Sequence, residues 1–262
     1  MAQGLGPCGV VPSWVQIPPP ALAIVFLNLF SIVIRMKDGD IVYIHYIGTV
    51  KETGEVFDIT DEEKAKELNV YNPKVEYGPI PIIIGGKFIL PALEEEIKKM
   101  EVGEEREVEL PPEKAFGNRS KELIRSFSYN DFQKQGITPR AGEWITINNL
   151  RGRIVSVSGG RVMVDFNHPL AGKTLHYKIK VVKKAEKPEE KVKAILEFYM
   201  KKIANDFDVE ITNGECKITD KKNVLTPEQR KILADTILKW VSEVNKLKFV
   251  YEFQKENKES SE

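Results

Sequence analysis

Histidine and cysteine, which often build catalytic and metal sites, are scarce in this sequence. The chain has three histidines, His45, His168 and His176, and two cysteines, Cys8 and Cys216. The cysteines form no CxxC motif, and no third ligand lies at a suitable spacing from His168 and His176. We therefore interpret both of these histidines as structural, and we expect neither a metal nor another cofactor.

The composition limits the class of protein. A length of 262 residues leaves room for about two domains of roughly 100–200 residues each. The 42% of hydrophobic and 30% of charged residues are typical of a globular chain and exclude a mostly disordered one. Because 39 Lys and Arg balance 39 Asp and Glu, the chain lacks the net positive charge of many nucleic-acid-binding proteins, and we expect no such partner.

The first half of the chain alternates between strand and helix patterns. Residues 41–48 (IVYIHYIG) alternate and are rich in β-branched and aromatic side chains, which predicts a strand. Thr60 and Glu63 have the spacing of a capping box and predict a short helix. Pro91 predicts the start of a helix that continues to Met100, because its fixed φ suits a first helical position.

The character of the sequence changes after Asn118. Residues 153–166 predict a hairpin that turns at Gly159-Gly160. The charged stretch 183–190 (KKAEKPEE) indicates a linker, and a separate unit follows it. This unit contains two amphipathic helical patterns and a hairpin with an Asn-Gly turn, and Thr226 and Gln229 predict the cap of its second helix.

Four segments together resemble the FKBP-type peptidyl-prolyl cis-trans isomerases, and in particular the SlyD-like subgroup. They are residues 39–58, residues 84–104 (IGGKFILPALEEEIKKMEVGE), residues 110–117 (LPPEKAFG) and residues 167–177 (NHPLAGKTLHY). Each segment is a weak signal alone, but all four in this order are specific. The C-terminal unit resembles, more loosely, that of the long archaeal members.

The resemblance implies an α+β fold with four parts. Residues 36–117 and 168–185 would form the isomerase domain, a curved antiparallel sheet around a short helix. Residues 118–167 would form a small β-rich chaperone domain inserted in the flap, and residues 188–256 a C-terminal α+β domain. Residues 1–35 would be an N-terminal extension.

The implied reaction is rotation about the peptide bond before proline, which has a barrier of about 18–20 kcal/mol. Rotation needs no nucleophile, metal or proton transfer, because the twisted transition state loses amide resonance and with it charge separation. An apolar pocket that removes water from the bond therefore favours the twisted state. By resemblance the pocket residues are Tyr46, Phe57, Ile89, Leu90, Leu93, Phe116 and Tyr177.

Two polar groups complete the implied site. Asp58, directly after Phe57 in a strand pattern, would be the carboxylate that hydrogen-bonds within the site and polarises it. The backbone N–H of Leu90 would hold a substrate carbonyl. Without the resemblance, the aromatic residues would be interpreted as ordinary core of a small sheet.

The chain departs from the family pattern at three places. Leu93 stands where many relatives have tryptophan, although SlyD-like members often lack it too. Phe116 replaces the common tyrosine, which removes a hydroxyl that could bind a peptide or a macrolide. Residues 59–80 are longer than in minimal members.

The inserted segment is rich in large apolar residues. They are Leu123, Ile124, Phe127, Tyr129, Phe132, Ile137 and Trp144. One interpretation is the core of the insert itself. The other is that part of this apolar surface is exposed and captures unfolded chains, whose prolines then reach the pocket.

We therefore expect a cytoplasmic prolyl isomerase and chaperone that acts on unfolded or nascent polypeptides containing proline. The alternative is a non-catalytic holdase or adaptor that binds peptides through the same fold. A macrolide ligand and a homodimer through the C-terminal domain remain open. Residues 189–256 carry thirteen basic and thirteen acidic residues, which argues against nucleic-acid binding there.

The first 35 residues have a pattern of their own. Residues 21–34 (ALAIVFLNLFSIVI) are apolar but shorter than the about 20 residues of a membrane-spanning helix. No Lys or Arg precedes them, unlike in a signal peptide. The favoured interpretation is sequence translated from a misplaced start, with the soluble pattern beginning at Met36. A weak membrane anchor or export signal is the alternative.

Overall fold

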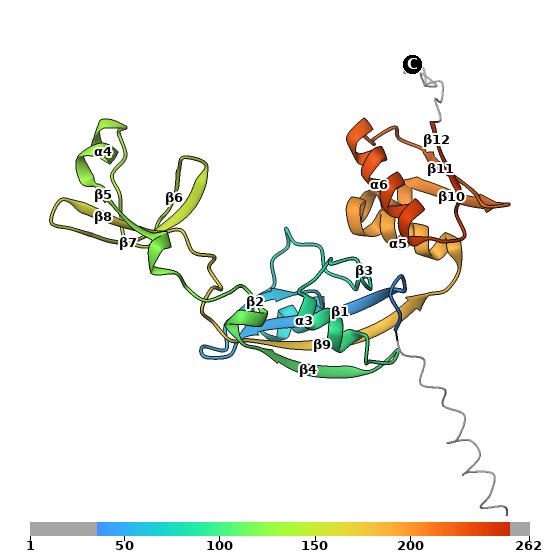
Figure 1. Cartoon of the computed structure of the whole chain (residues 1–262), viewed down its shortest axis with the longest axis horizontal. Coiled ribbons are helices and arrows are strands. Elements are labelled where there is room, and N and C mark those ends of the chain that lie inside the picture. Colours follow the sequence, from blue (N-terminus) through green and yellow to red (C-terminus); the bar gives the residue numbers. More distant parts are fainter. Residues whose placement is uncertain (1–35, 252–262) are drawn as a thin grey trace, which may run out of the picture. The chain divides into compact units, whose positions relative to one another are not determined.

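A computed structural model describes residues 36–251 of the chain (Figure 1). The extension expected at 1–35, with its apolar run 21–34, lies outside the described residues. Residues 36–251 form three sheets and several short helices, which confirms the α+β class. None of the helices in this range is long and apolar enough to cross a membrane.

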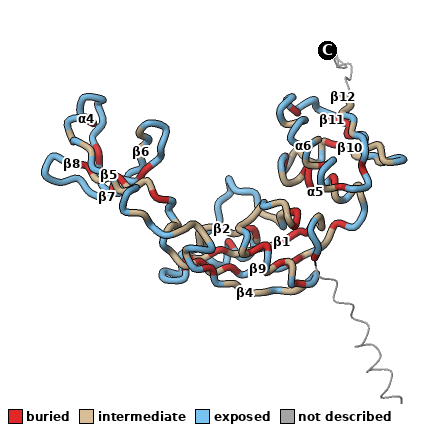
Figure 2. The backbone as a smooth tube through the Cα atoms, in the orientation of Figure 1, coloured by how far each residue is buried: buried red, intermediate tan, exposed pale blue. Residues whose placement is uncertain are grey.

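The first sheet is antiparallel and has five strands. They are β1 (Ile41–Val50), β2 (Val56–Ile59), β3 (Ile80–Ile83), β4 (Glu105–Leu110) and β9 (Leu175–Ala185). Their order is β2-β1-β9-β4, and β3 pairs with the first half of β1 beside β2. The long pair β1 and β9 forms the centre of the sheet and contains many of its buried positions (Figure 2).

One face of β1 and the helix α3 (Pro91–Ile97) share a core. Val42 and Ile44 of the strand pack in the same buried cluster as Leu93 and Ile97 of the helix. Pro91 occupies the first turn of α3 as predicted, while the helix ends before the expected Met100. The α-helical spacing of Leu93 and Ile97 places both on the face of α3 that meets the sheet.

The short helix α2 (Glu62–Glu67) begins differently from the sequence prediction. Its N-cap is Asp61, whose carboxylate accepts a hydrogen bond from the Lys64 N–H at 3.1 Å. Thr60 is instead bound to β1, because its hydroxyl accepts from the Tyr46 N–H at 2.9 Å and lies 3.1 Å from Nδ1 of His45. A contact distant in sequence has thus replaced the predicted capping box.

The second sheet belongs to the inserted segment. Two short 3₁₀ helices, η1 (Pro112–Lys114) and η2 (Lys121–Leu123), lead into it. The strands of this sheet are β5 (Ile124–Ser128), β6 (Trp144–Ile147), β7 (Leu150–Ser158) and β8 (Arg161–Asp165), in the order β5-β8-β7-β6. The helix α4 (Tyr129–Lys134) follows β5 in the chain. β7 and β8 form the predicted hairpin, in which Gly159 and Gly160 have positive φ angles of 56° and 72°.

The core of the insert is small. It contains Phe132, Ile154, Val162 and Val164 as its buried residues. By contrast, Trp144 and Val155 are 45% and 49% exposed. Of the predicted apolar residues of the insert, Phe132 therefore belongs to its core, whereas Trp144 lies at its surface.

The C-terminal part contains two helices and a third sheet. Its elements are α5 (Pro188–Met200), η3 (Lys201–Asp206), β10 (Phe207–Thr212), β11 (Glu215–Asp220), α6 (Pro227–Trp240) and β12 (Lys246–Tyr251). β10 and β11 form the predicted hairpin at Asn213-Gly214, and β12 pairs parallel to β11. Thr226 and Gln229 form the predicted capping box of α6.

The expected linker at 183–190 is mostly regular structure. β9 continues to Ala185 and α5 begins at Pro188. The apolar core of the C-terminal part also includes Ile41 and Tyr43 of β1. This part therefore packs on the second face of β1.

A buried carboxylate organises the turn between β11 and α6. Asp220 is 0% exposed, and it accepts hydrogen bonds from the N–H groups of Val224 at 3.2 Å and Leu225 at 3.1 Å.

We expect Asp220→Ala to lower the free energy of unfolding by about 2–4 kcal/mol, because buried donors lose a charged acceptor. Urea unfolding followed by tryptophan fluorescence measures this. The control Asp208→Ala removes an exposed ion pair with Lys221, so we expect less than about 1 kcal/mol; equal losses would contradict the assignment.

Candidate functional site

A cavity of about 290 Å³ lies where α3 and the loop before it meet the first sheet. Its walls are almost entirely aliphatic and aromatic. They are formed by Ile44, Tyr46, Phe88, Ile89, Leu90, Leu93, Ile97, Phe116, Tyr177 and Ile179. Six of the eight predicted site residues are in this set, namely Tyr46, Ile89, Leu90, Leu93, Phe116 and Tyr177.

The other two predicted residues contact this set from β2. The Phe57 ring meets the Tyr177 ring edge-on, with centroids 5.6 Å apart, and Tyr177 lies 6.0 Å from Tyr46. Gly48, opposite Tyr177 in the sheet, makes room for these rings. A Cβ at this position would lie 2.6 Å from Phe57, so a larger residue would displace the ring.

Asp58 is joined to the cavity wall by a short hydrogen bond. The Tyr46 hydroxyl donates to Oδ2 of Asp58 at 2.6 Å. Burial, and then the bond to Asp58, raise the pKa of Tyr46 far above the ordinary 10 of a tyrosine. Burial and the Asp58 charge raise the pKa of Tyr177 to about 12. Both phenols therefore stay neutral at physiological pH, and among residues 36–251 the charge at this wall is that of the exposed Asp58 carboxylate.

The loop between β3 and α3 is held by a second carboxylate. Glu94 is only 7% exposed, and it accepts hydrogen bonds from the N–H groups of Gly85 at 2.8 Å and Lys87 at 3.3 Å. Both loop residues have positive φ, 83° and 59°. Within residues 36–251 the Leu90 N–H has no hydrogen-bond acceptor, so it is free to bind a ligand carbonyl.

Phe116 brings the two ends of the insert together at the cavity. Its ring stacks on His168, with centroids 4.1 Å apart and planes 6° from parallel. Nδ1 of His168 accepts from the Leu170 N–H at 3.2 Å, which orients the imidazole.

Elsewhere, Nε2 of His176 lies 3.4 Å from a Glu107 carboxylate oxygen. Among residues 36–251, no three His, Cys, Asp or Glu side chains are grouped as metal ligands.

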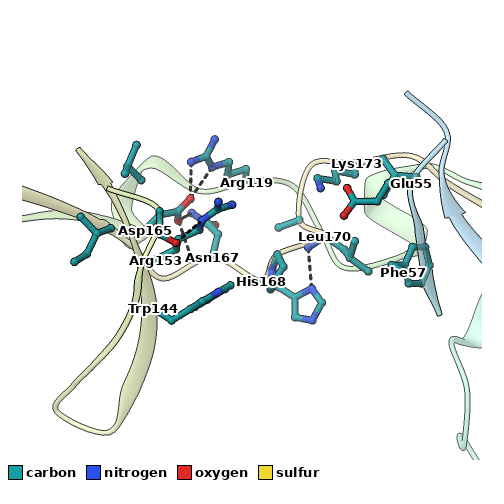
Figure 3. Close-up of a pocket in the computed structure, with 16 residues that line it drawn as sticks. Glu55, Phe57, Arg119, Trp144, Arg153, Asp165, Asn167, His168, Leu170 and Lys173 are labelled. Carbon is teal, nitrogen blue, oxygen red and sulfur yellow. Dashed lines mark hydrogen bonds and ion pairs between the residues drawn. The ribbon is translucent and has the colours of Figure 1, made fainter. Parts of the chain in front are cut away.

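Hydrogen bonds connect the first and last residues of the insert (Figure 3). The Arg119 Nε donates to Asp165 at 3.0 Å, and Asn167 bonds both the N–H and the C=O of Ser120. Burial raises the pKa of Asp165, but the bonds from Asn167 and Arg119 outweigh it and lower that pKa.

A further cavity at this junction is lined by Phe57, Trp144 and other residues. Its lining is more charged than that of the cavity at Tyr46.

Four residues of the cavity wall were not expected from the sequence. They are Ile44, Phe88, Ile97 and Ile179. Strand alternation from Tyr46 and helical spacing from Leu93 could have indicated Ile44 and Ile97. Phe88 directly precedes two predicted site residues, but the sequence alone does not show which way its ring points.

Comparisons with known proteins locate relatives for most of the described chain. Residues 129–170 match the family described as FKBP26, IF domain. The chain is 40% identical over 146 residues to the short-type peptidyl-prolyl cis-trans isomerase of Methanocaldococcus jannaschii, covering 56% of this chain and 92% of that protein. It is 33% identical over 131 residues to the FKBP-type peptidyl-prolyl cis-trans isomerase SlyD of Helicobacter pylori, covering 48% and 70%. The FKBP-type 16 kDa isomerase of Escherichia coli is 34% identical over 104 residues, covering 38% and 69%.

The role of Glu94 in the loop can be tested through stability. Glu94→Ala leaves the Gly85 and Lys87 N–H groups without their acceptor, so we expect the free energy of unfolding to fall by about 2–4 kcal/mol. Glu95→Ala is the matched control, because that side chain is 66% exposed and ion-pairs only at the surface; we expect less than about 1 kcal/mol. Urea unfolding measures both, and a similar loss in the two variants would refute the assigned role.

Proposed function

The chain belongs to the FKBP-type peptidyl-prolyl cis-trans isomerases and is SlyD-like, and from this membership we propose that the cavity at Tyr46 is where its isomerase activity takes place. The observation that supports this most directly is the convergence of Tyr46, Phe116 and Tyr177 around one apolar space. Phe57 is outside this lining and packs edge-on against the Tyr177 ring. A volume of about 290 Å³ leaves room for a proline ring.

In the proposed mechanism the low polarity of the cavity walls lowers the rotation barrier. A planar amide carries separated charge on oxygen and nitrogen, and water stabilises that charge. Walls of Ile44, Leu93, Ile97 and Ile179 offer no such stabilisation, whereas the twisted transition state requires less of it. Each preference of about 1.4 kcal/mol for the twisted state increases the rate tenfold.

Two groups would orient the peptide. The free Leu90 N–H would donate to a substrate carbonyl, which leaves the proline ring over Leu93 and Ile97. Asp58 accepts from the Tyr46 hydroxyl and so holds that ring as one wall. The Asp58 carboxylate then lies beside the amide whose nitrogen becomes more basic as the bond twists. Phe116 presents no hydroxyl, so macrolide affinity would depend on the other walls.

For the insert we propose the capture of unfolded segments. Trp144 and Val155 are exposed on it, and the Arg151 guanidinium carbon lies 4.8 Å from the centre of the Trp144 ring. Such a surface is suited to apolar and aromatic side chains. The match of residues 129–170 to an IF domain supports treating 118–167 as the insert and 36–117 with 168–185 as the isomerase domain.

Unfolded or nascent polypeptides containing proline are then the proposed substrates, in the cytoplasm. Within the described part of the chain, residues 36–251, Cys216 is buried and forms no disulfide, which is compatible with a reducing compartment. We propose residues 188–256 as the C-terminal domain. Whether it forms a homodimer is a separate question that sedimentation of the full chain answers.

The first test concerns the hydrogen bond at the cavity wall. Asp58→Ala frees the Tyr46 ring and removes the carboxylate, so we expect kcat/KM for a proline tetrapeptide to fall about tenfold, equivalent to about 1.4 kcal/mol. The control Glu63→Ala removes a nearby exposed carboxylate in α2 and should leave the rate unchanged. An unaltered rate for Asp58→Ala would contradict the proposed site. A wild-type rate equal to buffer alone would instead favour the holdase.

The second test separates capture from catalysis. The double variant Trp144→Ser, Val155→Ser removes exposed apolar surface, so we expect catalysed refolding of a proline-limited protein to slow about tenfold. The tetrapeptide rate should not change, because the cavity is untouched. Ile232→Ser, Leu238→Ser is the matched control, since both side chains are similarly exposed on α6. Equal refolding rates for the wild type and the insert variant would rule out capture by this surface.

A further inference from the structure

Helix α5 of the C-terminal part contacts the loop that forms one wall of the isomerase cavity. The contact is made by Phe88, which lines the cavity and directly precedes Ile89 and Leu90. The Phe88 ring meets the ring of Phe198 in α5 edge-on, with centroids 4.6 Å apart and planes at 78°. Tyr199 is the next ring, with its centroid 6.4 Å from that of Phe88.

The contact lies at the border of a continuous apolar core. Ile41 and Ile83 of the first sheet are 1% and 4% exposed, and they belong to the same buried cluster as Ile195 of α5, which is 1% exposed. The free space between these elements and Phe88 is only about 10 Å³, at the lower limit for one water molecule. The helix and the loop are thus in close apolar contact.

Glu197 of the same helix acts on Tyr43 of β1. Burial, and then hydrogen bonding and charge from Glu197, raise the pKa of the Tyr43 hydroxyl above the ordinary value of a tyrosine. The Lys183 ammonium lies 4.0 Å from the centre of the Tyr43 ring. The Lys183 contact lies within the sheet, between β9 and β1, whereas the apolar cluster of Tyr43 and Ile195 joins β1 to α5.

Phe88 is the part of the loop that reaches the core of the C-terminal part. Glu94 holds the Gly85 and Lys87 N–H groups of the loop, and the Phe88 side chain packs on the apolar cluster that contains Ile195 of α5. The Phe88 ring folds over Gly86, where a Cβ would lie 2.4 Å from it. The ring is thus enclosed between Gly86 on its own loop and Phe198 on α5.

We propose that α5 positions the substrate-binding loop of the isomerase cavity through the contact of Phe198 with Phe88. Phe198 is a positioning residue: it holds Phe88 in the wall, and the backbone of Ile89 and Leu90 follows. The C-terminal part would then support proline isomerisation in the same chain as well as packing on the sheet. This inference rests on the proposed location of the active cavity.

A double-mutant cycle in the full chain tests the proposal. We expect Phe198→Ala to lower kcat/KM for a proline tetrapeptide about threefold to tenfold, in the lower part of the range that coupling energies between contacting residues span. In a Phe88→Ala background, Phe198→Ala should have no further effect, because its partner is gone. A general loss of stability would reduce the rate in both backgrounds. Phe198→Leu, which retains most of the volume, should show a smaller loss and serves if the alanine variant does not fold.

Phe249→Ala is the matched control, because Phe249 packs on the same C-terminal core from β12. It should leave kcat/KM within about twofold of wild type. The proposal is overturned if Phe198→Ala leaves kcat/KM unchanged, if its effect is equal in both backgrounds, or if Phe249→Ala has the same effect. If Asp58→Ala and Phe88→Ala slow catalysis while Phe198→Ala does not, only this inference fails. If neither Asp58→Ala nor Phe88→Ala slows catalysis, the cavity itself is wrongly assigned.

Discussion

The structure depends on the packing of both faces of one strand. Side chains alternate along β1, so Val42, Ile44 and Tyr46 face α3 while Ile41 and Tyr43 face α5. A strand buried on both sides needs apolar residues at consecutive positions, and the run IVYI at its start meets this need. The same strand thus provides a wall of the cavity and the surface on which the C-terminal part packs.

This arrangement explains how an apolar cavity is combined with a carboxylate. Asp58 is exposed at the wall and interacts with the cavity through the Tyr46 hydroxyl, so its charge remains in contact with water. The neutral phenols of Tyr46 and Tyr177 present ring faces and edges to the enclosed space. In the proposed mechanism the transition state is less polar than the ground state, so such an environment favours it, and the free Leu90 N–H is the group proposed to orient the peptide.

Features encoded by neighbouring residues were predictable from the sequence. Pro91 at the start of α3, the capping box of Thr226 and Gln229, and the turn at Gly159-Gly160 all depend on contacts within a few residues. The α+β class and six residues of the cavity wall followed from the resemblance of ordered segments. Such resemblance carries information on long-range contacts that local patterns do not contain.

Features set by contacts distant in sequence were not predictable. Thr60 has a helix-capping pattern, yet its hydroxyl accepts from the Tyr46 N–H of β1 instead, because a tertiary donor competes with the local one. The charged stretch at 183–190 resembles a linker in composition, but β9 and α5 occupy nearly all of it. Phe88 was missed for the same reason, since its neighbours on α5 are more than a hundred positions away.

The central claim is that the proline of the substrate binds in the cavity between α3 and the first sheet. Two-dimensional amide NMR of the full chain during titration with a proline tetrapeptide tests it directly, because exchange of the bound peptide between cis and trans forms is observed in the same samples. The account predicts the largest shift changes at the amides of Ile89, Leu90 and Phe116, together with cis–trans exchange of the peptide. Shift changes confined to the insert or to the C-terminal part, with exchange still catalysed, would contradict it.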